Sequence, residues 1–349
     1  YKHLRLLDNI YDVIALNNKE DKSIIENVRK DHNFKKFNVR YVGNYNDVVM
    51  SMNNKNVIKG IINMFKYIKE SINQADLVNY DIVYSSSIPC FTHFAAYKIK
   101  RKHPEIKWVA SFSDPIYKSP YKKDPETFKE YSLLEKIGFY VYIFIYMNSI
   151  FEKKAMKYAD EIIMISEAQK EFMCSNYVED YRYKSNVVPL NYIKEWDIYS
   201  DLIQSKHIKN DKLIGIHLGR IYGLRKIDSF IIAVSELKEE LDGKIEFHQY
   251  GEIQNRYVKM INDFNLNNII IFKDKVDYKE AMKKLDEADI LLLFDTIMQG
   301  DNQPYLPSKI VEYMLMNKPI LAISEPNSPS YKILFENNYI FHFLLSELK

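Results

Sequence analysis

The sequence is first informative in what it lacks. Glycine is scarce: there are 9 glycines in 349 residues, whereas an average content near 7% would supply about 24. Five of the nine fall between residues 215 and 251. Because glycine adopts backbone conformations that other residues avoid, this clustering indicates a stretch of the second half in which backbone freedom is required.

Cysteine is rarer still. The two residues, Cys90 and Cys174, are 84 positions apart, which excludes a CxxC zinc or redox motif and a disulfide framework. No cluster of histidine, cysteine and acidic residues has the spacing of metal ligands, so the sequence predicts no metal site. Thiols without a pattern favour a reducing compartment, and we expect a cytoplasmic protein.

Charge of one sign and long apolar runs are also missing. The chain has 49 basic and 47 acidic side chains, with the two signs mixed along it, whereas a nucleic-acid-binding protein shows a basic stripe. The longest uncharged run, residues 137–151, has 15 residues and would extend about 22 Å as a helix. A bilayer core requires about 30 Å. These observations argue against nucleic acid as a partner and against a transmembrane helix.

What the sequence does contain is a repeated alternation of two kinds of segment. Short runs of β-branched residues predict buried parallel strands, and apolar residues at i, i+3, i+4 and i+7 predict amphipathic helices. Strands are predicted at residues 11–16, 81–84, 108–112, 161–165, 213–218, 245–250, 269–272, 290–294 and 319–323, and helices at 58–72, 227–241, 278–285 and 308–316. Such alternation forms a doubly wound parallel sheet, and here it occurs twice.

The predicted fold class is therefore α/β, with two Rossmann-like doubly wound parallel-sheet domains facing a cleft. We place the first domain at residues 1–190, a polar linker at 191–211 and the second domain at 212–349. Ligands of such domains bind at the carboxyl ends of the strands. Residues 2–7 look like the end of a helix that leads into the strand at 11–16, so we expect the first central strand of this fold to precede residue 1.

Two segments of the second domain carry chemistry. The turn after the strand at 213–218 combines glycines with cations: Gly219, Arg220, Gly223, Arg225 and Lys226. Glycine lets the backbone approach a ligand, helix N-termini favour anions, and arginine binds phosphate with two hydrogen bonds. The turn lacks the Walker and GxGxxG patterns, so a phosphate site and a solvated basic turn both remain open.

The second segment begins a predicted helix near the end of the chain. Pro307 suits the first helical position, and the backbone N–H groups of residues 308–310 would then face an anion. Glu312 follows about 7 Å along the helix axis, which suits a carboxylate that binds both hydroxyls of a ribose. The alternative is an exposed glutamate paired with Lys309, which contributes only a few tenths of a kcal/mol.

Together the two segments resemble the donor half of GT-B-fold glycosyltransferases, most closely glycosyltransferase family 4. Members carry a Gly-Arg…Arg/Lys turn and a Pro-x-Lys-x-x-Glu-Tyr helix followed by Lys-Pro-Ile. The matching residues here are Gly219-Arg220…Arg225-Lys226, Pro307-Ser308-Lys309-Ile310-Val311-Glu312-Tyr313 and Lys318-Pro319-Ile320. Residues 81–87, 108–115 and 159–167 are similar to the family's acceptor domain in order and spacing, and the likeness covers roughly residues 75–335.

The resemblance implies a retaining transfer of a sugar from a nucleoside diphosphate donor to a glycan or lipid-linked acceptor, as in bacterial surface polysaccharide synthesis. It implies no cofactor and no obligatory metal. By position, Arg225 is a catalytic candidate, and Tyr250, Gly251 and Val276 would line the base pocket. The donor-binding candidates are Gly219, Arg220, Lys226, Tyr250, Gly251, Val276, Ser308, Lys309 and Glu312.

The sequence also departs from the family pattern. The usual donor-sugar glutamate, eight residues before Glu312, is Pro304 here, with Asp301 and Gln303 nearby. In the first domain, Asp114 follows the strand at 108–112 where the family has a histidine, which makes it the second catalytic candidate. A turn-initiating role before a proline is the alternative for Asp114.

The histidines and the long uncharged segment have other expected roles. His217 and His248 are expected to be core residues, and His93 is expected to be a surface or core residue rather than a ligand. Residues 137–151, apolar and flanked by lysines, are predicted to lie in the first domain's core or on an anionic membrane, at the inner face of the cell membrane.

A GT-B-like sugar-nucleotide epimerase and a catalytically inactive glycosyltransferase-like binding protein are the alternative functions.

Overall fold

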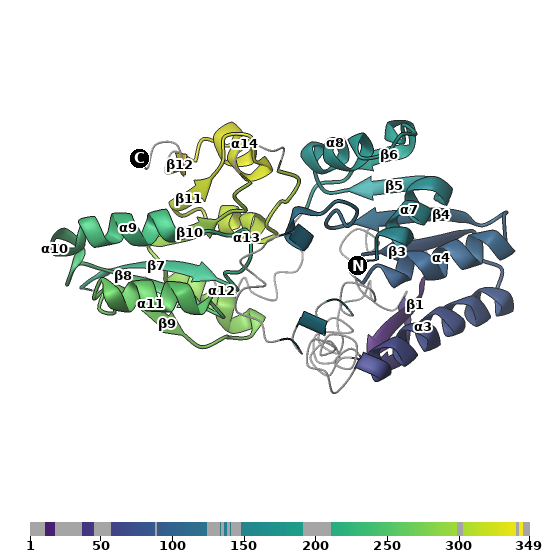
Figure 1. The fold of residues 1–349 in the computed structure, drawn as a ribbon, viewed down its shortest axis with the longest axis horizontal. Helices are drawn as coiled ribbons and strands as arrows, with labels where there is room; N and C mark the ends of the chain where they lie inside the picture. Colours follow the sequence, from purple (N-terminus) through teal and green to yellow (C-terminus); the bar gives the residue numbers. More distant parts are fainter. Residues whose placement is uncertain are drawn as a thin grey trace. The chain divides into compact units, whose positions relative to one another are not determined.

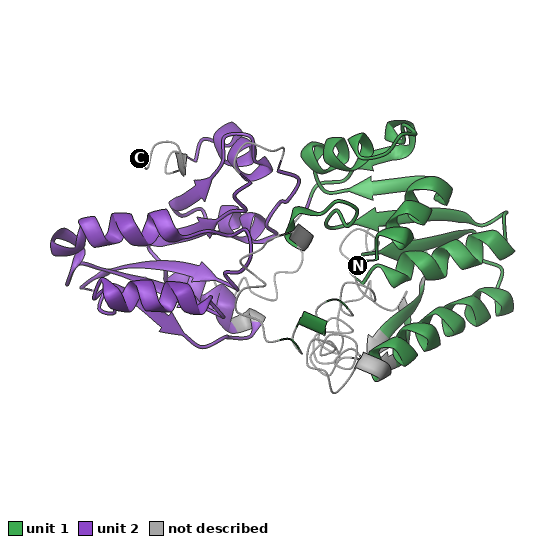
Figure 2. Ribbon diagram, viewed as in Figure 1, with its two compact units in different colours: residues 1–189 green, residues 190–349 purple. Residues whose placement is uncertain are grey.

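The structure is a computed structural model that describes residues 11–17, 37–44, 57–87, 89–123, 133, 136–137, 140, 148–190, 211–298, 303–339 and 342–344. The chain divides into two compact units, residues 1–189 and 190–349 (Figure 2). Each unit is described by itself below. Residues 191–210 of the predicted linker lie outside the described part of the chain.

Unit 1 contains two parallel sheets among its described residues, where one was predicted (Figure 1). The first pairs β1 (Tyr11–Asn17) with β2 (Phe37–Asn44). The second has the strand order β3 (Ile82–Ser86), β4 (Lys107–Phe112), β5 (Glu161–Met164) and β6 (Ser185–Val187). The sequence analysis missed β2, whose apolar residues alternate with polar ones, and β6, which has 3 residues.

Helices connect these strands. They are α3 (Val57–Leu77), α4 (Phe91–Lys102), α7 (Ser149–Tyr158) and α8 (Glu167–Ser175), with short 3-10 turns η5 (Pro120–Lys123) and η6 (Arg182–Lys184). The Ser166 side chain begins α8 by accepting a hydrogen bond from the Gln169 N–H, which satisfies one of the unpaired donors at a helix start. Trp108 and Phe112 of β4 are fully buried, and burial of such a side chain contributes about 1.5–3 kcal/mol.

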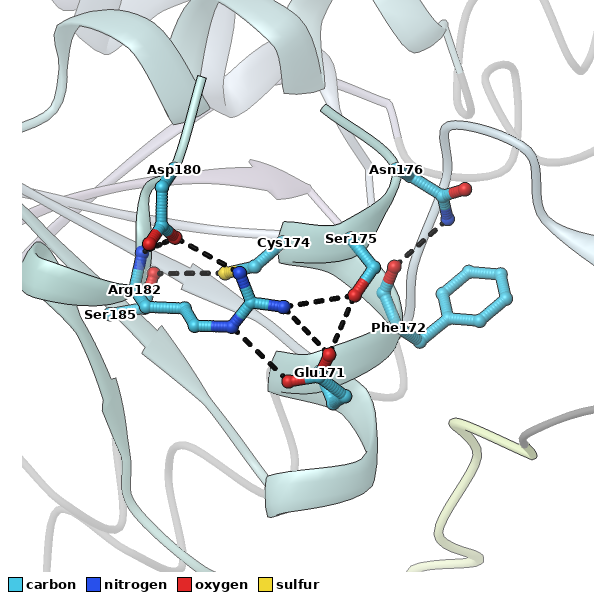
Figure 3. Close-up of polar contacts among 8 residues, drawn as sticks. All are labelled: Glu171, Phe172, Cys174, Ser175, Asn176, Asp180, Arg182 and Ser185. Atoms are coloured by element: carbon cyan, nitrogen blue, oxygen red, sulfur yellow. Dashed lines mark hydrogen bonds and ion pairs between the residues drawn. The ribbon is translucent and has the colours of Figure 1, made fainter. Parts of the chain in front are cut away.

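A surface network joins α8 to the start of β6 in unit 1 (Figure 3). Arg182 donates to both carboxylate oxygens of Glu171, at 2.6 and 3.2 Å, and to Asp180 at 3.1 Å. It also donates to the Ser175 hydroxyl at 3.0 Å. The two parallel bonds to Glu171 are the bidentate geometry in which arginine binds carboxylates best.

Unit 2 has a six-stranded parallel sheet of order β12-β11-β10-β7-β8-β9. Its strands are β7 (Leu213–Leu218), β8 (Ile245–Tyr250), β9 (Ile270–Lys273), β10 (Ile290–Phe294), β11 (Ile320–Ser324) and β12 (His342–Leu344). Because the chain passes from β9 to the opposite side of β7, the strand order reverses between β7 and β10. The carboxyl ends at this reversal are where doubly wound sheets bind ligands.

The helices of unit 2 include α11 and α14, which were not predicted, and differ from the prediction at residues 227–241. They are α9 (Asp228–Glu236), α10 (Lys238–Leu241), α11 (Asn255–Asp263), α12 (Tyr278–Glu287), α13 (Lys309–Leu315) and α14 (Pro329–Glu336). The predicted helix at 227–241 is therefore two helices, which meet at Leu237. The rings of Phe247 and Phe294 pack edge-on against Phe230 of α9, each at 5.1 Å between centroids, in a preferred aromatic arrangement.

Candidate functional site

The carboxyl ends of β7 and β8 meet through two glycines. Gly219 donates its N–H to the Tyr250 carbonyl at 2.7 Å, and the φ angles of Gly219 and Gly251 are 107° and 111°, a region that side chains disfavour. A Cβ on Gly251 would lie 3.1 Å from the Gly219 backbone. The structure thus brings two of the predicted donor-binding positions into contact, and glycine is required at both.

Lys309, the first residue of α13, reaches this glycine turn. Its Nζ lies 3.2 Å from His217 Nε2, and a Cβ on Gly219 would lie only 3.0 Å from the same atom. Burial, and secondarily the charge of Arg225, lower the pKa of Lys309 to about 7, against an opposing effect of Glu312. An amine held in this way is a group whose charged form a bound anion would stabilise.

The two arginines of the turn have different surroundings. Arg225 is half-buried, donates to the Arg220 carbonyl at 3.2 Å and lies near enough to Lys309 to lower its pKa. The side chain of Arg220 is 67% exposed and pairs with Glu252 at 2.8 Å. Lys226, the next cation along, is half-buried. The structure therefore places Arg225 beside Lys309 and gives Arg220 a partner at the surface.

Glu312 lies half-buried in α13, not exposed as in the alternative interpretation. Its carboxylate affects the pKa of both Lys309 and Tyr313, which places it beside them. The fully buried Tyr313 accepts the Leu218 N–H at 3.2 Å, which fixes α13 to the carboxyl end of β7. Lys309, Glu312 and Arg225 consequently belong to one site.

The start of α13 requires a correction. Pro307 precedes the helix instead of opening it, and the exposed Ser308 is the cap residue, with φ −59° and ψ −26°. Ile310 donates its N–H to the Pro307 carbonyl at 3.1 Å, so it cannot face an anion as predicted. The expected anion contacts of the Ser308 and Lys309 backbone stay predictions.

The base-pocket candidates have different surroundings in the structure. Tyr250 lines a groove of about 520 Å³ together with His248 of β8 and Lys284 of α12. Gly251 contacts Gly219 instead, and Val276 is half-buried between β9 and α12. A shared role of Tyr250, Gly251 and Val276 in binding a base stays a prediction.

Gln303, next to the missing donor-sugar glutamate, has a structural role. Its side chain is 1% exposed, donates to the Thr296 carbonyl at 3.0 Å and accepts the Tyr305 N–H at 2.9 Å. Both ends of the amide are thus occupied by the backbone of the segment that leads into α13. Gln303 is not placed to substitute for the glutamate replaced by Pro304, and Asp301 lies outside the described residues.

In unit 1, Asp114 is half-buried just beyond β4, and the segment after it is anchored by Glu152 of α7. The Glu152 carboxylate, 1% exposed, accepts the N–H groups of Ile116 at 2.6 Å and Tyr117 at 2.9 Å. It also accepts the Tyr177 hydroxyl at 2.6 Å. The sequence analysis missed Glu152, although an acid directly after the long uncharged run is a signal of a paired buried charge.

His217 and His248 were predicted to lie in the core and His93 either in the core or at the surface, and His93 and His217 are buried. His93 is fully buried, with Nδ1 2.8 Å from the Ser85 hydroxyl, which accepts the Trp108 Nε1–H, and burial lowers the pKa of His93 to about 3. His217 is also buried. The prediction is wrong for His248, which is half-buried and bonded to Glu246 at 2.9 Å, because this face of β8 lines the groove.

The described residues were searched for metal-binding groups and for helices that could span a membrane. Among them, no group of three or more histidine, cysteine or acidic residues could hold a metal ion. No helix in this part of the chain is long and apolar enough to cross a bilayer. Of the segment 137–151, residues 138–139 and 141–147 lie outside the described residues; Tyr140 is exposed, whereas Phe151 is buried and packs against Phe94.

No protein-family model matches the chain. A poly(ribitol-phosphate) alpha-N-acetylglucosaminyltransferase of Staphylococcus aureus (strain COL) is 27% identical over 188 residues, 51% of this chain and 34% of the relative. An uncharacterized glycosyltransferase of Methanocaldococcus jannaschii is 30% identical over 176 residues, 49% of this chain and 42% of the relative. The matches thus span less than half the length of either relative.

A solved structure decides the fold. HepE of Anabaena in complex with UDP matches with a TM-score of 0.55 at 14% identity, over 95% of this chain and 77% of that one. The fold is that of the GT-B glycosyltransferases. The predicted fold class is confirmed, and the sequence relatives of the chain are glycosyltransferases. The finer likeness to family 4 stays a prediction.

Proposed function

We propose that the protein is a retaining glycosyltransferase of the family 4 type, which moves a sugar from a nucleoside diphosphate donor to a glycan or lipid-linked acceptor. The observation that carries the proposal is the convergence of Arg225, Lys309 and Glu312 on the glycine turn at the carboxyl end of β7. Unit 2 is accordingly the donor-binding unit, and unit 1, with Asp114, is the acceptor-binding unit.

The chemistry of the reaction matches these residues. When the glycosidic bond to the donor breaks, the departing diphosphate gains negative charge, and fixed cations beside it lower the barrier. The loss of one such contact costs about 3 kcal/mol. The Arg225 guanidinium offers bidentate hydrogen bonds, and the Lys309 amine offers a compact charge in a site partly removed from water. The Glu312 carboxylate can accept both hydroxyls of a ribose.

The comparisons suggest which substrates to examine first. The Staphylococcus aureus relative is named for the transfer of N-acetylglucosamine to poly(ribitol-phosphate), a phosphate-containing polymer. The matched HepE structure contains UDP. We therefore propose a uridine donor and an acceptor of the bacterial cell-surface polysaccharide class. We propose no metal cofactor, since the cations of the site can neutralise the diphosphate.

We also retain the proposal that the protein acts in the cytoplasm, at the inner face of the cell membrane. Lysines of α7 lie over tyrosine rings: Lys153 is 3.9 Å from the centre of Tyr117, and Lys154 is 4.5 Å from the centre of Tyr97. Aromatic rings and lysines together suit an anionic lipid surface. Flotation with anionic vesicles tests this proposal. Binding that weakens with salt and with the double change Lys153→Glu and Lys154→Glu supports it, and no binding at low salt contradicts it.

A panel of nucleotide sugars tests the activity. We expect transfer from one donor of the panel to a polysaccharide acceptor, and NMR of the product should show that the anomeric configuration is retained. An epimerase would instead change the free nucleotide sugar without any acceptor. A binding protein would bind a nucleotide without turnover. Either of these results, or an inverted product, would contradict the corresponding part of the proposal.

A further inference from the structure

His217 lies under the glycine turn, on β7, and only 1% of it is exposed. Its ring packs against Phe294 with 4.9 Å between the ring centres. Nδ1 lies 2.9 Å from the Leu292 carbonyl oxygen, and Nε2 lies 3.2 Å from Lys309 Nζ. The ring therefore connects the neighbouring strand β10 to the amine of the proposed donor site.

These two contacts determine where the ring proton lies. A carbonyl oxygen can only accept a hydrogen bond, so Nδ1 carries the proton and donates it to Leu292. Burial and the neighbouring charge of Lys309 lower the pKa of His217 well below its usual value, which keeps the ring neutral. Nε2 consequently presents a lone pair to Lys309 and accepts one of its N–H groups.

We propose that His217 is a positioning residue for Lys309: it holds the amine against the glycine turn through Nε2 and leaves the other N–H groups for the diphosphate of the donor. The role of the diphosphate rests on the proposed function. The contact between His217 and Lys309 does not, because it joins two side chains of unit 2 and involves no donor group.

The charges that face Lys309 come from three parts of unit 2. Neutral His217 lies on β7, Arg225 lies in the turn that follows β7, and Glu312 lies on α13 itself. Of the two charged groups, only Glu312 favours the charged amine. A bound diphosphate adds negative charge and completes the surroundings of the ammonium ion, so nucleotide binding is expected to transfer a proton from solvent to Lys309 Nζ.

NMR of 15N-histidine-labelled protein tests the contact without any nucleotide. We expect His217 to remain in the neutral, Nδ1-protonated form from pH 5 to pH 8. We also expect its Nε2 resonance to shift in Lys309→Met, where the hydrogen-bond donor is lost. A ring protonated at Nε2, or a ring that titrates near the usual pKa of about 6.5, would overturn the proposal and leave the proposed function standing.

Calorimetric titration with UDP tests the consequence. We expect His217→Phe, which keeps a ring but has no acceptor, to weaken binding at least tenfold. His217→Gln retains an acceptor near the position of Nε2 and should remain within about threefold of wild type. In the Lys309→Met background, His217→Phe should cause no further loss, because coupled residues are not additive. His103→Phe is the matched control and should bind as wild type, because His103 is a half-buried histidine of unit 1 whose ring pairs with Asp76 at 2.8 Å.

The outcomes separate the two proposals. Wild-type affinity in His217→Phe, or equal losses from His217→Phe with and without Lys309→Met, would overturn the positioning role. Failure of the wild-type protein to bind UDP, GDP, CDP or ADP would contradict the proposed function, and the NMR result would then decide the role of His217 by itself.

Discussion

The two units handle charge in opposite ways. In unit 2, Arg225 and Lys309 are held close together at the carboxyl end of β7, although burial and then the charge of Arg225 lower the pKa of the amine. In unit 1, the buried Glu152 carboxylate receives three hydrogen bonds from neighbours within the same unit. A charge that the fold fully satisfies serves architecture, whereas cations that the fold brings together against their repulsion indicate a ligand of opposite charge.

The largest effect should come from the cations and carboxylate of unit 2. Arg225→Ala and Glu312→Ala each remove a charged contact to the donor, and we expect kcat/KM to fall by an amount equivalent to about 2–4 kcal/mol. Circular dichroism should show that both variants remain folded. Arg182→Ala, an arginine change on the surface of unit 1, is the matched control. Wild-type kcat/KM in both site variants would show that the donor site is assigned wrongly.

The buried carboxylate of unit 1 should instead affect stability. Glu152→Gln replaces an acceptor oxygen with an NH2 group that faces N–H and O–H donors, and we expect the free energy of unfolding to fall by about 2–4 kcal/mol. Urea denaturation measures the loss. Glu105→Gln, at a carboxylate that is 71% exposed, should change the stability by less than about 0.5 kcal/mol. Equal stability of Glu152→Gln and wild type would remove the contrast between the units.

Nucleotide affinity should depend on pH through Lys309. Its pKa is lowered to about 7, so the amine of the unliganded protein loses its proton as the pH rises above 7, and the charged form binds a diphosphate better. UDP affinity should therefore fall between pH 7.5 and 9, by up to about tenfold per pH unit. Lys309→Arg, which stays charged throughout, should remove this dependence. A wild-type UDP affinity that stays constant from pH 7.5 to 9 in calorimetry would contradict this prediction.

The smallest effect should come from the surface network of Figure 3. Arg182 is partly exposed, and its bonds to Glu171 and Asp180 compete with water. We expect Arg182→Ala to lower the midpoint of urea unfolding slightly at low salt and not at high salt. Exposed ion pairs contribute little to stability, and salt screens them. A large, salt-independent loss would show that the network is structural in the same sense as Glu152.

The sequence predicted the frame of unit 2 more completely than its contacts. The strands β7, β8 and β10 have the predicted bounds, and β9 and β11 lie one residue later than predicted. The short β12 was missed, because a run of 3 residues has no period to recognise. The alternation of strands and helices was sufficient for the fold class, since few topologies bury such strands.

The site was predicted in its members but not in its geometry. The motifs identified Arg225 and Glu312 by their side chains but Lys309 only by its backbone N–H, whereas the structure places the Lys309 amine in the site with them. Motif spacing could not show that Gln303 is occupied by backbone groups, because those contacts depend on the local conformation of the segment that leads into α13. It also could not show that His217 contacts Lys309, because the two residues lie 92 positions apart in the sequence. The role of Glu152 was also missed, because its hydrogen-bond donors lie more than 20 positions away along the chain.

Nucleotide binding by matched arginine variants tests the central claim most directly. Calorimetric titration of wild type, Arg225→Ala and Arg182→Ala with UDP, GDP, CDP and ADP would compare the two units under the same conditions. We predict that one nucleotide binds the wild type, that Arg182→Ala binds it equally well, and that Arg225→Ala binds it at least tenfold more weakly. Equal binding by all three proteins, or no binding by the wild type, would contradict the assignment of the donor site to the carboxyl end of β7.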